Sequence, residues 1–191
     1  MGAMDDIPPE MGATPAPLVP TARQGLVSRM IRALKLDSTL YEEVEHDPKA
    51  NTETVYVIVI VSIAQAIGLL IRNLIVGGSI SGVISAGVGG FITTIVGLAI
   101  WSYLLYFVGT KLFHGVATPG EVWRSTGYAR SPGIFLIIPI VGFVVNIWIL
   151  VAYIIAARQS LDLTTGKAIA AVIVSAIPYI IILGFLSLFL S

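Results

Sequence analysis

Few side chains in residues 54–191 could take part in chemistry. The acidic, basic and imidazole groups there are Glu121, Asp162, His114, Arg72, Lys111, Arg124, Arg130, Arg158 and Lys167. Catalysis usually needs a base with a shifted pKa beside a second polar group. The sequence has no GxSxG elbow, no HExxH pair and no GxxxxGKS/T loop. We therefore predict that the protein is not an enzyme and has no catalytic residues.

Cofactor and ion sites are not expected either. An ion-coupled transporter usually carries an acid at mid-membrane, and the apolar segments contain none. His114 lies at the end of one such segment, and a lone histidine there is more often structural than a haem or pigment ligand. Cysteine is absent, which excludes thiolate ligands. The acidic run over residues 42–47 is typical of a solvated face, so we predict no cofactor and no metal.

The composition is that of an integral membrane protein. Hydrophobic residues make up 56% and charged residues 12% of the 191 residues, with a mean hydropathy of +0.92. A soluble domain carries about 25% charged residues, so this chain could not cover its surface in water. The net charge of zero argues against nucleic acid as a partner. We expect membrane lipids, and other membrane proteins or a second copy of the chain, as partners.

Changes of composition divide the chain into three parts. Residues 1–24 are rich in proline and acids, which predicts a disordered tail. Residues 25–53 predict two cytoplasmic surface helices, the second ending before Pro48. Residues 54–191 form the transmembrane domain. Nine acids against five bases give residues 1–53 a charge of −4, and six bases against two acids give the transmembrane domain +4.

The stretch GLVSRMIRALKL at residues 25–36 predicts an amphipathic helix. Arg29, Arg32 and Lys35 share one face of it, opposite a face of mostly apolar residues. A basic amphipathic helix beside a first span is typical of a helix that lies on the anionic cytoplasmic leaflet. The alternative is a helix that packs on the protein's own spans. We favour the lipid surface.

Three apolar stretches, at residues 54–76, within 77–113 and at 168–190, are long enough to cross a membrane. The second contains small residues at every fourth position, a spacing that lets two helix backbones approach closely in lipid. These predicted helix-packing residues are Gly78, Gly82, Ala86 and Gly90. Their partner is either a neighbouring span or a second copy of the chain.

Residues 133–157 are also apolar, but Pro139–Gly142 is a turn signal within them. A single span would place the basic residues before and after it on opposite sides of the membrane, against the positive-inside rule. A hairpin, with helices over about 120–138 and 142–160, keeps them together. We therefore predict an all-α membrane protein of about five membrane helices, the third and fourth forming this hairpin. The N-terminus should be cytoplasmic and the C-terminus on the opposite side.

Several segments, in order, resemble one known family. The stretch MIRALKLDSTLYEEVEHDPKANTETVYVIVIVSIAQAIG is similar to the opening of bacterial Yip-domain proteins, relatives of the eukaryotic Ypt/Rab-interacting membrane proteins. Further similar segments are YFVGTKLF at 106–113, TPGE at 118–121, RSTGYA at 124–129, SPG at 131–133, ARQSLD at 157–162 and TGKAI at 165–169. The resemblance covers about residues 29–185. At His114 it leads us to expect a small residue.

The resemblance implies five membrane helices and a cytosolic N-terminus. Eukaryotic members are implicated in vesicle traffic and bind prenylated Rab GTPases, a partner that bacteria lack. We therefore expect a non-catalytic role in membrane organisation or protein–protein docking, in the cell inner membrane. The alternative is a small accessory subunit of a larger respiratory or photosynthetic membrane complex.

Overall fold

The structure is a computed structural model that describes residues 25–190, without the side chains of Ile80, Val83, Ala86 and residues 187–190. The predicted tail over residues 1–24 lies outside it. Every regular element within the described residues is a helix, which confirms the predicted all-α class. The elements are α1 (Leu26–Leu34), α2 (Ser38–Glu45), α3 (Ala50–Ile75), α4 (Ile80–Lys111), α5 (Pro119–Ala129), the 3-10 helices η1 (Ser131–Ile137) and η2 (Pro139–Val141), α6 (Gly142–Ser160) and α7 (Thr165–Leu190).

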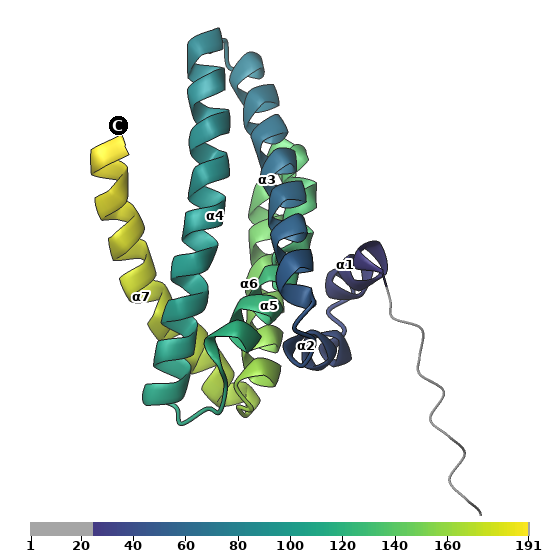
Figure 1. Cartoon of the computed structure of the whole chain (residues 1–191). Helices are drawn as coiled ribbons and strands as arrows, with labels where there is room; N and C mark the ends of the chain where they lie inside the picture. The colour runs from purple at the N-terminus through teal and green to yellow at the C-terminus, as the bar shows by residue number, and fades with distance from the viewer. Residues whose placement is uncertain (1–24, 191) are drawn as a thin grey trace, which may run out of the picture.

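Four segments of the described helices are long and apolar enough to cross a membrane. They are Ala50–Ile75, Gly87–Lys111, Pro139–Ser160 and Thr165–Leu186. Figure 1 shows α3 and α4 side by side, joined at the end of the bundle farthest from α1 and α2, with α7 along α4. The C-terminal end of α7 points away from α1 and α2.

The chain reverses direction at Pro139–Gly142, where the hairpin is predicted. Phe135 in η1 stacks on Trp148 in α6, with ring centroids 5.7 Å apart, so the segments on the two sides of the turn run antiparallel. The arm before the turn is not the continuous α-helix predicted over 120–138. It consists of α5 followed by two 3-10 helices. Pro132 and the proline that opens η2 account for this break, because proline has no backbone N–H to donate and its ring clashes with the preceding turn.

The hairpin arm η1 lies directly against α3. A Cβ atom added at Gly68 would lie 1.9 Å from the Leu136 carbonyl oxygen. One added at Gly133 would lie 2.6 Å from Cγ1 of Val61. Small residues at such points let two backbones approach closely in a membrane protein. One side of the irregular arm thereby packs on protein, and its first residues, 131–133, are buried; contact with protein is what makes non-helical backbone tolerable at membrane depth.

The predicted helix-packing residues are Gly78, Gly82, Ala86 and Gly90. A Cβ atom at Gly90 would lie 3.2 Å from Cδ1 of Leu69, so this glycine faces α3. Gly78 and Gly82 instead lie beside the side chain of Asn73, near the connection between α3 and α4. The side chain of Ala86 lies outside the described residues. A continuous packing face through all four positions stays a prediction.

The backbone explains why a small residue is expected at His114. This residue follows α4 with a φ of 58°. That left-handed conformation favours glycine, which has no Cβ to clash.

Replacement of Gly68 tests the contact between η1 and α3. Gly68→Ala should destabilise the protein by about 1–3 kcal/mol, because the added methyl group overlaps the Leu136 carbonyl. Gly87→Ala is the matched control: it adds the same group to α4 where nothing lies within 4 Å. The control should be neutral or slightly stabilising. Thermal unfolding in mild detergent measures both, and equal effects would contradict the contact.

Candidate functional site

The helices α1 and α2 form a cap on one end of the bundle. Leu40, Tyr41 and Val44 of α2 are completely buried, and the cap shares one apolar core with the spans. Figure 1 shows α1 beside the first part of α3, while α2 lies across the end of the bundle, where it contacts α5 and α6. The cap is therefore an integral part of the fold.

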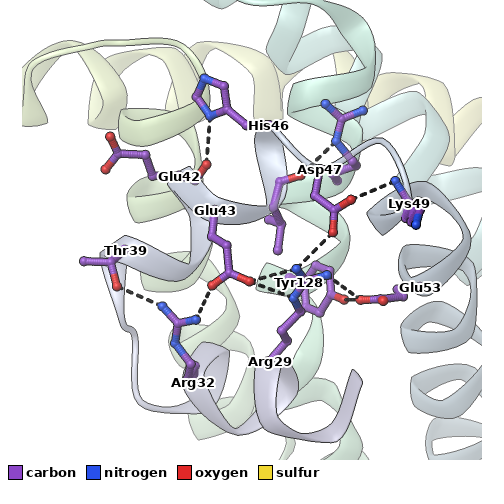
Figure 2. A network of polar contacts seen from close by, with 12 residues as sticks. Arg29, Arg32, Thr39, Glu42, Glu43, His46, Asp47, Lys49, Glu53 and Tyr128 are labelled. Atoms are coloured by element: carbon purple, nitrogen blue, oxygen red, sulfur yellow. Dashed lines mark hydrogen bonds and ion pairs between the residues drawn. The ribbon is translucent and has the colours of Figure 1, made fainter. Parts of the chain in front are cut away.

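Arg29 lies at the centre of a polar network in the cap (Figure 2). It is 2% exposed, and its guanidinium donates to Glu43 at 2.8 and 3.0 Å, to Asp47 at 3.0 Å and to Glu53 at 2.7 Å. These carboxylates belong to α2, the α2–α3 connection and the first turn of α3. A buried guanidinium without such partners would be strongly unfavourable. Arg29 therefore fixes the position of α1 against α2 and α3.

A second arginine, Arg32, extends the network toward the solvent. It donates to Oδ2 of Asp37 at 2.7 Å and to the Thr39 hydroxyl at 2.8 Å, and it also pairs with Glu43. The other oxygen of Asp37 accepts the backbone N–H of Thr39 at 3.0 Å and caps the N-terminus of α2. The Asp37 carboxylate thus caps the N-terminus of α2 and also binds Arg32 of α1.

Two side chains of α5 connect the cap to the bundle. The Tyr128 hydroxyl donates to Glu53, the same carboxylate that Arg29 contacts. Arg124 donates to the backbone carbonyl of Val44 at 2.9 Å and to that of Glu45. These are carbonyls of the last turn of α2, which have no partner within the helix. Arg124 therefore caps the C-terminus of α2 from another element.

Two carboxylates beside the arginines, Glu43 and Asp37, have lowered pKa values. Burial raises the pKa of Glu43, but hydrogen bonds from Arg32 and Arg29 outweigh this effect and lower its pKa below the ordinary value. Hydrogen bonds from Arg32 and Thr39 likewise lower the pKa of Asp37. The pairs that Glu43 and Asp37 form with the arginines are therefore ionic at neutral pH.

Glu45 is in a different electrostatic environment. It is 7% exposed, and its Oε2 has no hydrogen-bond partner within the described part of the chain. A surface pocket of about 260 Å³ is lined by Glu42, Glu45, Arg158, Gln159, Asp162 and Leu163. Burial raises the pKa of Glu45 to about 7; His46 opposes this shift, while Asp162, Glu121 and Glu42 add to it. Glu45 therefore titrates near neutral pH.

The structure corrects the predicted placement of Arg29, Arg32 and Lys35 on one lipid-facing basic surface. Arg29 is buried and Arg32 pairs with acids, because the carboxylates that follow α1 in the sequence draw both guanidinium groups inward. Lys35 is exposed, together with Val27 and Ile31, which are 68% and 46% exposed. The inner face of α1 thus packs on protein, the alternative that the sequence left open. Contact of the outer face with lipid stays a prediction.

Sequence reasoning did not find Glu53, Arg124 or Tyr128 as members of this network. Glu53 lies at the edge of the first predicted span, and the two α5 residues lie more than 70 positions from their partners. The excess of acids over bases in residues 1–53 could have indicated such a network, because buried acids require basic partners.

The chemistry that the network supports is structural. Its charged groups pair with one another and hold helices together. Within residues 25–190, no three His, Cys, Asp or Glu side chains lie close enough to hold a metal ion.

A comparison with protein families matches residues 38–188 to the Yip1 domain. The match covers most of the chain, so the protein belongs to this family of multi-pass membrane proteins. Helix α1 precedes the matched residues, whereas its partners Glu43, Asp47 and Glu53 lie within them. Comparisons with curated proteins and with solved structures gave no match.

Glu45 should make the stability of the protein depend on pH. Its pKa is about 7 in the folded protein against an ordinary value of 4.5, so folding takes up a proton between these values and stability falls as the pH rises through this window. Glu45→Gln should remove this slope and be more stable above pH 7 by about 1–3 kcal/mol. Glu42→Gln, an exposed change at the same pocket, should keep the slope. Thermal unfolding measured from pH 5 to 8 tests this prediction. If the stability of Glu45→Gln fell with rising pH as steeply as that of the wild type, the raised pKa of Glu45 would be contradicted.

Proposed function

We propose that the protein has a non-catalytic role in membrane organisation and protein docking, with its cap in the cytoplasm at the inner membrane. The observation that carries this proposal is the packing of the cap on the bundle. Arg29 and Arg124 fix α1 and α2 to the bundle at two separate points. Surfaces of the cap therefore keep a constant height and direction relative to the membrane.

The outer face of α1 supports a contact with the lipid interface. Val27, Ile31 and Lys35 recur at four-residue spacing on this face and are all exposed. Figure 1 shows α1 beside the first part of α3, near the spans. Apolar side chains flanked by a lysine suit the boundary between headgroups and acyl chains. The lysine would bind anionic headgroups, at about 1 kcal/mol per basic residue.

The outer surface of α2 and its following turn supports docking of a protein. Glu42, His46 and Lys49 are exposed there, at the end of the bundle and away from α1. The distribution of charge supports a cytoplasmic position for this end. Lys111, Arg158 and Lys167 lie at the helix ends nearest the cap, as the positive-inside rule expects.

Photo-crosslinking tests both halves of the proposal. A photoreactive residue at Val27 should form lipid adducts, whereas one at His46 should form adducts with protein in intact membranes. Ser81 is the matched control, because it is exposed at the opposite end of the bundle and should give no protein adduct. The proposal would be contradicted if Val27 gave protein adducts without lipid adducts. It would also be contradicted if His46 gave no protein adducts.

The alternative is an accessory subunit of a larger membrane complex, and native mass in mild detergent separates the two. The docking role predicts that the purified protein runs alone or as copies of itself. A stable stoichiometric complex with catalytic subunits would establish the accessory role instead.

A further inference from the structure

A second charged site lies inside the bundle, away from the cap. A cavity of about 190 Å³ opens among α3, α4, α6, α7 and the end of α5. Its lining residues are Gln65, Thr93, Thr94, Leu98, Arg130, Tyr153, Tyr179 and Leu183. A single water needs about 10–15 Å³ of such space, so the cavity has room for a polar group of several atoms.

The cavity extends from Tyr153, about 10 Å from the cap end of α6, toward the middle of the bundle. At 1.5 Å per residue, Gln65 lies about 18 Å beyond Glu53 along α3, and Tyr179 about 18 Å beyond Lys167 along α7. The hydrocarbon core of a bilayer is about 30 Å thick. Thr93 lines the cavity and is exposed, so the cavity is open at the surface of α4.

Arg130 gives this cavity a positive charge that the described residues do not neutralise. Arginine stays protonated in proteins, and a charge at membrane depth usually has a partner. No carboxylate lines the cavity among the residues described. Glu121 lies at the opposite end of α5, and Asp162 lies beyond the end of α6. The C-terminus of α5, which Arg130 follows, supplies only about half a negative charge.

Neutral hydrogen-bond donors surround the charge. Arg130 lies beside the Tyr153 hydroxyl, and Tyr179 lines the same cavity. The Thr94 hydroxyl donates to the Gly90 backbone carbonyl at 2.8 Å and lies 3.4 Å from the side-chain oxygen Oε1 of Gln65; the Gln65 amide nitrogen is a further donor in the cavity lining. The tyrosine rings are held in place by Trp101, whose ring centroid lies 5.1 and 5.3 Å from theirs.

We propose that this cavity binds the phosphate group of an anionic lipid. A cation surrounded by neutral donors is complementary to an oxyanion, because charge-assisted hydrogen bonds from a guanidinium are roughly twice as strong as neutral ones. A lipid is favoured over a soluble anion, because the cavity lies between membrane spans, where a soluble anion would have to leave water. Water alone would fill the space but leave the charge without a counterion.

Titration of the delipidated protein with phosphatidylglycerol tests the proposal. Native mass spectrometry counts the bound lipid, and thermal unfolding reports the stabilisation. Wild-type protein should bind phosphatidylglycerol in preference to phosphatidylcholine. Arg130→Gln should weaken this binding at least about tenfold, and Arg130→Lys should recover part of it. Lys111→Gln, which removes an exposed charge at the end of α4, should bind as the wild type does.

Two further arms complete the test. Tyr179→Phe removes one hydroxyl from the cavity and should weaken binding even if Arg130→Gln does not fold. Inorganic phosphate alone should not stabilise the protein; stabilisation that Arg130→Gln abolishes would keep the phosphate site but overturn the lipid as its source. Unchanged phosphatidylglycerol affinity in both Arg130→Gln and Tyr179→Phe would overturn the site.

Discussion

The arrangement of this protein depends on one buried guanidinium. Arg29 contacts carboxylates from three segments of the chain, and these come together only when α1, α2 and α3 are all in place. Removing one partner from a buried ionic cluster is costly, because the remaining charges stay buried without compensation. The same contacts turn the apolar residues Val27 and Ile31 outward. Burial of the Arg29 charge therefore determines which apolar residues of α1 are on its outer surface.

The fold could be predicted in outline because lipid imposes strong local rules. Apolar length identified the long spans, and the basic loops together with Pro139–Gly142 located the hairpin. The irregular form of the hairpin arm could not be predicted, because it depends on the close approach of Gly68 to the Leu136 carbonyl, a contact between distant segments. Prolines indicated a break in the helix there, but the packing that permits 3-10 turns at that position could not be predicted from the sequence.

The site was harder to predict than the fold. Helical periodicity correctly grouped Arg29 with Arg32, but it does not state what that face contacts. The nearby acids decided the outcome, since a guanidinium gains more from carboxylates in a partly buried site than from solvated headgroups. Arg124 and Arg130 occur in the arm predicted as a membrane helix over 120–138, yet one caps α2 and the other reaches a cavity between spans. Their partners lie in distant helices, so neither role has a local signal.

A double-mutant cycle between Arg29 and Glu53 tests the central claim most directly. Arg29→Gln, Glu53→Gln and the double variant should give a coupling free energy of at least about 1.5 kcal/mol, because the pair joins α1 to α3 and is largely buried. The more exposed pair of Arg32 and Asp37 should couple by less than about 1 kcal/mol. A coupling between Arg29 and Glu53 that is no larger than that of the exposed pair would contradict the account.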